Sequence, residues 1–191
     1  MNLYLLRHEK RDLNNPTFYS PLLEVGLENA DKLKYLLNKL NINLIFSSPF
    51  IRVLQTIEPY CIMKNKKVNR EFGLYENIDI NDNDTNQFKF DKNNFRIDVK
   101  KDDDKYYLLN EDYNSIVNLE EINYNTTIEN RVDKFINKII EQYKDTIINI
   151  LIVTHQSIIN TILKRNFSDE YPMGQVCQVI DLNNRSFQLI K

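Results

Sequence analysis

The sequence predicts an α/β fold, a three-layer sandwich around a mostly parallel central sheet, formed by a single domain over residues 1–191. Short apolar runs alternate with longer stretches whose apolar residues recur every three or four positions, the pattern of alternating strands and one-sided helices. The strongest strand signal, residues 147–153, is apolar except at Asn149 and mostly β-branched, as in a strand covered on both faces. With 42% hydrophobic residues, a chain of 191 residues can form one well-buried core.

The first two apolar runs, residues 2–6 and 44–46, are predicted strands because they are too short for helices. Between them, spacings of three and four from Leu27 onward predict a helix with one buried face. The members of that face are Ala30, Leu33, Leu36, Leu37 and Leu40. Strand, helix and strand in this order form the unit from which parallel sheets are built.

A second helix is expected to follow the second strand. Ser47-Ser48-Pro49 marks its start, because serine caps helix N-termini and proline is common at the first helical position. This helix is expected to carry Arg52. Pro59 lies farther along it and predicts a kink or a break.

The second half of the chain is predicted to contain a polar insertion, two helices and the remaining strands. In order, we expect a strand at 68–72, an insertion or cap at 77–127, a helix at 128–143, a helix opening at Ser157, and closing strands at 176–182 and 187–190 with a turn at Asn183-Asn184. The insertion is rich in Asn, Asp and Lys and lacks sustained periodicity. A solvated loop is the alternative interpretation of that segment.

Composition excludes several classes of partner. The net charge of −2 creates no overall field for nucleic acid or an anionic membrane, and no apolar run reaches the ~18 residues of a membrane span. The N-terminal apolar run is also too short for a signal peptide, so we expect a cytoplasmic protein with no nucleic-acid or membrane partner. Cys61 and Cys177 lack zinc-ligand spacing and are expected to be reduced structural thiols.

The chain contains 2 histidines, and each directly follows a predicted strand. His8 comes after residues 2–6, and His155 comes after residues 147–153. Ligands of open α/β sheets collect at the carboxyl ends of neighbouring strands. The two imidazoles are therefore expected to face one site although they lie far apart in the sequence.

Arginines accompany both of the predicted strand ends in the first part of the chain. Arg7 and Arg11 flank His8, and Arg52 opens a helix, so up to three guanidinium groups can match the oxygens of a phosphate. Imidazoles can supply a nucleophile and stabilise transition-state charge, and a carboxyl group such as Glu76 can protonate a leaving group. Each of these residues alone is more often structural, so spacing by itself predicts only a phosphate-binding α/β protein.

Five segments resemble the motifs of the histidine phosphatase (phosphoglycerate mutase-like) superfamily, in the family's order. Leu6-Arg7-His8-Glu9 is similar to its Arg-His-Gly signature, and residues 47–56 are similar to its second phosphate-binding segment. Residues 21–30 resemble the family's helix entry. The proton-donor segment of the family resembles Gly73-Leu74-Tyr75-Glu76, and its second histidine motif resembles Val153-Thr154-His155-Gln156-Ser157.

The resemblance implies a phosphoglycerate mutase-like fold and a metal-independent phosphatase of the histidine acid type. His8 is then the nucleophile that becomes phosphohistidine, while Arg7, Arg52 and His155 bind the transferred phosphoryl group. Glu76 is the general acid to the leaving group and then the base to water. The resemblance implies no metal and no cofactor, and the expected partner is a phosphorylated small molecule or a phosphopeptide.

Three positions refine or depart from this resemblance. The pair Arg11-Asp12 resembles the sequence of one branch of the superfamily, which contains the tyrosine phosphatase domains of the T-cell-signalling suppressors. In that branch, the arginine is an extra phosphate ligand. Gln156 replaces a small residue and is a further candidate for substrate binding. Glu9 replaces the family's glycine, and we expect its side chain to turn away from the site.

Two alternative functions stay open. A phosphoglycerate mutase is disfavoured because residues 10–15 lack the serine and the tryptophan-asparagine pair of the cofactor-dependent mutases. A weakly active scaffold protein that keeps the phosphate site is suggested by Glu9 and by the polar insertion.

Overall fold

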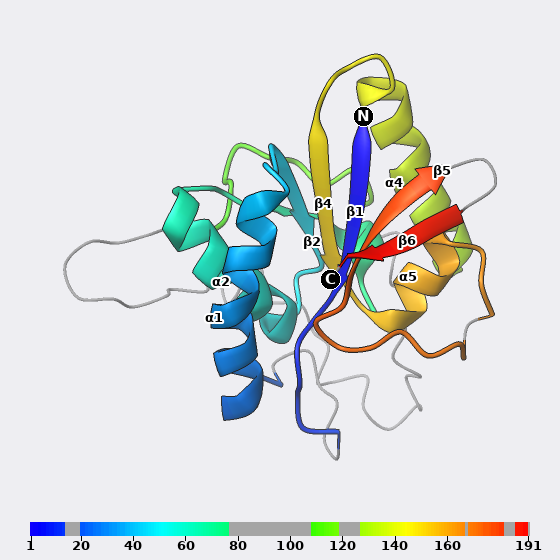
Figure 1. Cartoon of the computed structure of the whole chain (residues 1–191). Helices are drawn as coiled ribbons and strands as arrows, with labels where there is room; N and C mark the ends of the chain where they lie inside the picture. The colour runs from blue at the N-terminus through cyan, green and yellow to red at the C-terminus, as the bar shows by residue number, and fades with distance from the viewer. Residues whose placement is uncertain (14–19, 77–107, 119–126, 167, 182–185, 191) are drawn as a thin grey trace.

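The computed structural model describes residues 1–13, 20–76, 108–118, 127–166, 168–181 and 186–190. Their strands form one sheet in the order β3-β2-β4-β1-β5-β6 (Figure 1). These strands are β1 (Asn2–Arg7), β2 (Leu44–Ser47), β3 (Asn69–Arg70), β4 (Asn149–Thr154), β5 (Val176–Asp181) and β6 (Ser186–Ile190). The first four in chain order pair in parallel, whereas β5 and β6 are antiparallel to their neighbours, so the sheet is mostly parallel as predicted.

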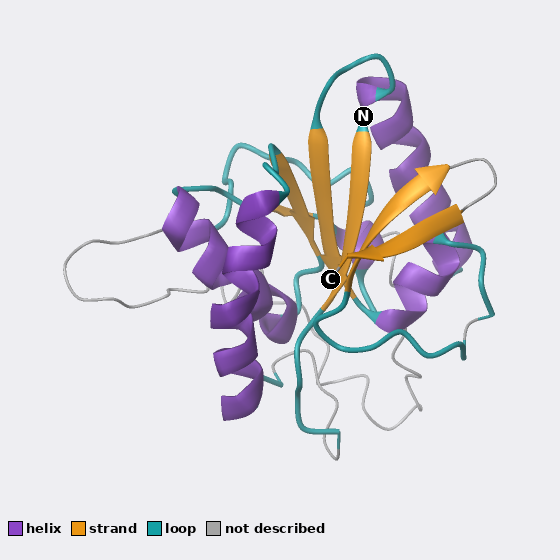
Figure 2. Cartoon of the chain, viewed as in Figure 1, coloured by secondary structure: helices purple, strands orange, loops and turns teal. Residues whose placement is uncertain are grey.

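Helices cover both faces of this sheet, which gives the predicted three layers (Figure 2). The helices are α1 (Glu24–Lys39), α2 (Ile51–Lys64), α4 (Ile128–Tyr143), α5 (Gln156–Ile162) and a short 3-10 helix, η1 (Phe72–Leu74). Figure 1 shows α1 and α2 on one side of the strands and α4 and α5 on the other. No helix in the described part of the chain is long and apolar enough to cross a membrane.

The two cores follow from the alternation of side chains along the strands. In β1, Tyr4 and Leu6 belong to the core that α1 and α2 cover, while Leu3 and Leu5 belong to the core under α4 and α5. The same alternation holds along β4, whose apolar side chains are all buried. Each such buried aliphatic side chain contributes roughly 1.5–3 kcal/mol to folding, so the central strands are the most strongly fixed elements.

Helix α1 begins at Glu24, three residues before the periodic pattern at Leu27. The early start depends on Gly26, because a Cβ there would overlap the backbone carbonyl of Lys10. Leu23 N–H also donates to the Lys10 carbonyl at 2.9 Å. The first turn of α1 therefore packs directly on the backbone that follows His8.

Helix α2 differs from the prediction at its start, near Pro49, and in its interior, at Pro59. It begins at Ile51 with Phe50 as its N-cap, and neither predicted serine caps it. It also runs through Pro59 without interruption, so of the predicted kink or break, the break is wrong. Burial of Tyr60 and Cys61 just beyond the proline offsets the ~3 kcal/mol that an interior proline costs a helix.

The strand boundaries differ from the predicted ones by a few residues. The strand predicted at 68–72 is only Asn69–Arg70, because the chain enters η1 directly afterwards. Strand β4 begins two residues later than predicted, since Ile147 is fully exposed at its approach. The closing strands pair as predicted, but the expected turn at Asn183-Asn184 lies outside the described residues.

Most of the predicted insertion, residues 77–127, lies outside the described residues. Of its described part, Thr127 caps α4, and residues 108–118 pack on the core through the buried side chains of Leu108 and Val117. Both cysteines are buried free thiols, as predicted.

The register of the parallel strands brings their carboxyl ends to one edge of the sheet. Arg7 at the end of β1 is paired with Thr154 at the end of β4, and Ser47 at the end of β2 lies beside both Val153 and Arg70. The residues that follow these four strands therefore share one edge.

Candidate active site

His8 lies at this edge and is only 1% exposed. Its backbone N–H donates to the Thr154 carbonyl at 3.0 Å, which ties it to the end of β4. Its ring Nδ1 lies 2.7 Å from the Glu9 carbonyl oxygen. Because a carbonyl can only accept, Nδ1 carries the hydrogen and the Nε2 lone pair is left available.

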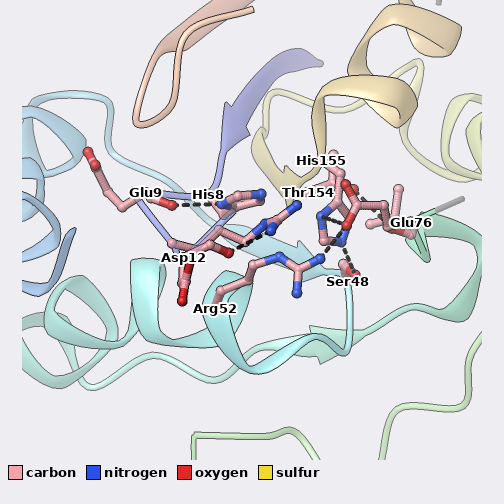
Figure 3. Close-up of polar contacts among 10 residues, drawn as sticks. His8, Glu9, Asp12, Ser48, Arg52, Glu76, Thr154 and His155 are labelled. Carbon is pink, nitrogen blue, oxygen red and sulfur yellow. Dashed lines mark hydrogen bonds and ion pairs between the residues drawn. The ribbon is translucent and has the colours of Figure 1, made fainter. Parts of the chain in front are cut away.

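His155 is the first residue after β4 and is completely buried. Its Nε2 lies 2.9 Å from Ser48 Oγ, and its Nδ1 lies 3.5 Å from a carboxylate oxygen of Glu76. The centroids of the His8 and His155 rings are 5.3 Å apart, with the rings inclined by 65° (Figure 3). The predicted meeting of the two imidazoles is therefore present in the structure.

Both imidazoles are held neutral near neutral pH. Burial lowers the pKa of His8 to about 3, and the charges of Arg52, Arg7 and Arg11 act in the same direction. Burial also lowers the pKa of His155 well below its ordinary value, again with Arg52 among the causes. A neutral His8 is the protonation state that a nucleophile requires.

Arg52, in the first turn of α2, is the most deeply buried charge of the site, with an exposure of 0%. Its Nη2 donates to the Glu76 carboxylate, and its guanidinium lies 4.5 Å from the centroid of the Phe50 ring. Burial lowers the pKa of Arg52 to about 10, so the group still carries its charge near neutral pH. The structure thus places Arg52 and Glu76 beside His155, as the sequence predicts.

Arg7 and Arg11 add two further guanidinium groups. Arg7 Nη1 donates to Gln156 Oε1 at 2.8 Å and to the Tyr171 carbonyl, and Arg11 Nη1 donates to the Asp12 carbonyl at 2.8 Å. Within the described part of the chain, the buried Nε of each has no hydrogen-bond partner. Because buried donors are seldom left unsatisfied, these two groups favour an anionic ligand.

The same cluster also contains a possible set of metal ligands. Atoms of His8, Glu76 and His155 lie within 4.8 Å of one another, which is close enough for one cation. The charges of Arg7 and Arg52 act on this cluster, however, and Coulomb repulsion opposes a divalent cation there. The arrangement therefore suits a phosphate-like anion better than a metal ion.

Gln156, a predicted substrate-binding residue, contacts other residues of the protein through its side-chain oxygen. Its Oε1 accepts from Arg7 Nη1 and, at 3.3 Å, from the Tyr171 backbone N–H. The side chain thus orients Arg7, while direct contact of its amide with substrate stays a prediction.

Two hydroxyl groups of the site are not among the predicted functional residues. The sequence predicts Ser48 as part of a helix cap, yet its Oγ contacts His155. Thr56 Oγ1 accepts from the Glu9 N–H at 2.9 Å and donates to the Arg52 carbonyl at 2.8 Å, which joins the His8 segment to α2. Both residues lie in the segment 47–56 that resembles the family's second phosphate-binding segment, and Ser48 also follows a strand end, so these two signals could have indicated them.

Glu9 turns its side chain away from the two imidazoles (Figure 3). The carboxylate is largely buried, and its Oε2 accepts from the Lys10 backbone N–H and from Asn29 Nδ2, each at 3.2 Å. It also occupies the space beside Gly174, where a Cβ would overlap Oε1. Residue 174 has a φ of 69°, a left-handed conformation that glycine adopts without strain.

Gly174→Ala is expected to reduce stability and activity together, because the new methyl group pushes the Glu9 carboxylate out of its place. We expect a loss of roughly 2–4 kcal/mol, since a steric overlap is added to the ~1 kcal/mol cost of an L residue in this conformation. In the double variant Gly174→Ala/Glu9→Gly, only the backbone strain should remain. Urea denaturation of the wild type, both single variants and the double variant measures the coupling, and strictly additive losses would contradict it.

The depressed histidine pKa values predict a loss of stability in mild acid. An unfolded histidine binds a proton near pH 6.5, whereas folded His8 does so only near 3, so between these values the unfolded state binds more protons. The free energy of unfolding is therefore complete above about pH 6.5 and falls with falling pH, by up to about 1.4 kcal/mol per unit for each histidine. Urea titrations from neutral pH to about pH 5 measure this slope. An unchanged slope in the double variant His8→Asn/His155→Asn would show that other groups cause it.

Comparisons with known sequences identify the family. A family profile described as the histidine phosphatase superfamily (branch 1) matches residues 3–187. No curated protein sequence gives a significant match.

Several solved structures share the fold at low sequence identity. The ecdysone phosphate phosphatase from Bombix mori, in complex with tungstate, has a TM-score of 0.64 and 12% identity over 100% of this chain and 92% of its own. A putative alpha-ribazole-5'-P phosphatase from Escherichia coli has a TM-score of 0.62 and 19% identity over 99% of this chain and 94% of its own. The mycobacterial glucosyl-3-phosphoglycerate phosphatase has a TM-score of 0.60 and 16% identity over 98% of this chain and 96% of its own.

These likenesses establish the fold, and the profile establishes the family, whereas the narrower assignment to the T-cell-signalling branch stays a prediction. The profile covers the residues that form the site at the sheet edge, from Arg7 to His155. The chain therefore belongs to the histidine phosphatase superfamily, branch 1.

Proposed function

We propose that this protein is a metal-independent phosphomonoesterase that acts in two steps through a phosphohistidine at His8. The observation that carries the proposal is the fixed tautomer of His8: Nδ1–H is held by the Glu9 carbonyl, which leaves Nε2 as the nucleophile beside His155 and Arg52. Family membership and the phosphatase neighbours support the same reaction class.

In the first step, Nε2 of His8 attacks phosphorus and the bond to the ester oxygen breaks. Arg7, Arg11, Arg52 and His155 stabilise the charge on the remaining phosphoryl oxygens. Glu76, which contacts both Arg52 and His155, is in its protonated form for this step and donates that proton to the leaving alkoxide.

In the second step, water replaces the alcohol. Glu76, now a carboxylate, accepts a proton from the attacking water, the phosphorus–nitrogen bond breaks, and inorganic phosphate leaves with His8 restored. The same carboxyl group thus serves first as acid and then as base.

We infer that the substrate is a phosphorylated small molecule. The similar structures are named for ecdysone phosphate, alpha-ribazole phosphate and glucosyl-3-phosphoglycerate, which are all phosphorylated small molecules. A phosphotyrosine-type substrate is the narrower possibility suggested by Arg11.

The test is hydrolysis of p-nitrophenyl phosphate in the presence of EDTA, followed by an alkaline quench and mass spectrometry of the peptide that contains His8. We expect release of phosphate without metal and one phosphoryl group on that peptide. Turnover that requires an added divalent ion, or turnover with no phosphoryl group on His8 at any time after mixing, would overturn the proposal. A panel of sugar phosphates, phenyl phosphate and a phosphotyrosine peptide then ranks the substrate classes.

A further inference from the structure

Glu71, directly after β3, is a charged side chain with an exposure of 0%. Its Oε1 accepts from the backbone N–H groups of Gly73 and Val117 at 2.9 and 3.1 Å, and its Oε2 accepts from the Ile116 N–H at 2.9 Å and from the Tyr113 hydroxyl at 2.6 Å. The Ser115 hydroxyl lies 2.8 Å from Oε1 as well. A buried carboxylate is tolerated only with such complete hydrogen bonding.

These donors come from two segments that are far apart in the sequence. Gly73 belongs to η1, whereas the other donors belong to residues 113–117. The second segment is itself fixed, because the Tyr113 ring packs 5.7 Å from the Phe46 ring centroid and Val117 is fully buried. Glu71 therefore connects η1 to the segment 113–117 through hydrogen bonds, although residues 77–107 separate the two in the sequence.

The segment between Glu71 and Glu76 is held at every residue after Phe72. The Gly73 carbonyl accepts from Arg131 Nη1 at 3.0 Å, and the Leu74 carbonyl accepts from Thr154 Oγ1 at 2.9 Å. The Tyr75 ring packs 4.7 Å from the Phe50 ring centroid. Glu76 follows directly and contacts Arg52 and His155.

We propose that Glu71 is a positioning residue that fixes the η1 segment, and through it the proton-donating carboxyl group of Glu76. This inference rests on the proposed function, in which Glu76 protonates the leaving group. Glu71 itself does not touch the reacting atoms. Because kcat/KM reports only the first step, in which Glu76 is the acid, the effect of Glu71 on kcat/KM should depend on how much the leaving group needs a proton.

The variant Glu71→Gln probes this role because it keeps the size of the side chain. One carboxylate oxygen becomes an NH2 group, which cannot accept a hydrogen bond. The Gly73 and Val117 donors, or else the Ile116 and Tyr113 donors, then lose their acceptor. In either orientation, the connection between η1 and residues 113–117 is weakened, while the side chains of His8, Arg52 and His155 are unchanged.

Substrates with different leaving groups separate this role from general loss of structure. Phenyl phosphate needs protonation of its leaving group much more than p-nitrophenyl phosphate does, because p-nitrophenolate is the more stable anion. For Glu71→Gln we expect kcat/KM on phenyl phosphate to fall by roughly ten- to a hundredfold and kcat/KM on p-nitrophenyl phosphate by less than about threefold. Glu76→Gln should show the same selectivity with a larger loss.

The exposed residue Glu141 in α4 offers a matched control, and Glu141→Gln should leave both rates unchanged. If Glu71→Gln does not fold, Tyr113→Phe removes a single donor and should show the same preference on a smaller scale. Equal losses on both substrates, or no loss, with an active wild type would overturn the role of Glu71 alone. A wild type that hydrolyses neither substrate would instead overturn the proposed function, and the inference with it.

Discussion

His8→Ala is expected to lower kcat for phosphomonoester hydrolysis by at least roughly 10³-fold, because removal of a covalent nucleophile leaves only binding and charge stabilisation. The remaining groups of the site, including Arg52 and His155, cannot form the phosphohistidine. The measurement is steady-state hydrolysis of p-nitrophenyl phosphate at saturating substrate, with the phosphorylated His8 peptide followed in parallel.

His8→Asn is the better structural control for the same position. The Asn amide can donate to the Glu9 carbonyl in place of Nδ1–H, so the local backbone should be kept. We expect tungstate or phosphate to raise the melting temperature of this variant as it does that of the wild type, because ligand binding to the folded state stabilises it. Retention of full activity in either His8 variant would refute the assignment of the nucleophile.

Arg52→Lys is expected to lower kcat/KM by roughly 10²–10³-fold, the usual effect of removing one preorganised donor from a developing oxyanion. Lysine keeps the charge but is a single point donor, whereas the Arg52 guanidinium can hold two phosphoryl oxygens at once. The guanidinium group also contacts Glu76 and lies against the Phe50 ring, and a lysine cannot reproduce both contacts.

Arg165→Lys is a matched control for this substitution, because Arg165 pairs with Asp169 and takes no part in the proposed reaction. Its kcat/KM should stay within about twofold of the wild type, as is usual for a change at a partly exposed ion pair. Comparable losses of kcat/KM in Arg52→Lys and Arg165→Lys would contradict a specific role of the Arg52 guanidinium group.

The sequence was most informative where a strong pattern coincides with a strand end. Strand β4 has a continuous apolar pattern and β1 is short and apolar, so the positions of His155 and His8 at their ends could be predicted. Helix α4 has the bounds that its periodicity indicates. In these cases local sequence and tertiary packing favour the same structure.

Prediction failed where packing overrides the local signal. Pro59 predicts a kink or a break, but α2 continues through it, and the residues after it are buried in the core. Ser48 has the sequence of a helix cap and instead contacts an imidazole that is distant in the sequence. Glu71 lies in a predicted strand beside the charged residue Arg70, and the role proposed for it depends on donors from 113–117 that no local pattern connects to it.

The chain has only 3 glycines, and all of them contact segments that carry the site. Gly26 packs on the backbone of Lys10, Gly73 lies between Glu71 and Val117, and Gly174 faces Glu9. An added methyl group would overlap the Lys10 backbone at Gly26, the Val117 side chain at Gly73 and the Glu9 carboxylate at Gly174. A directed-evolution library that seeks new substrates should therefore leave these three codons unrandomised. A side chain at any of the three glycines would displace a segment that positions a residue of the site, so the variable positions should lie elsewhere.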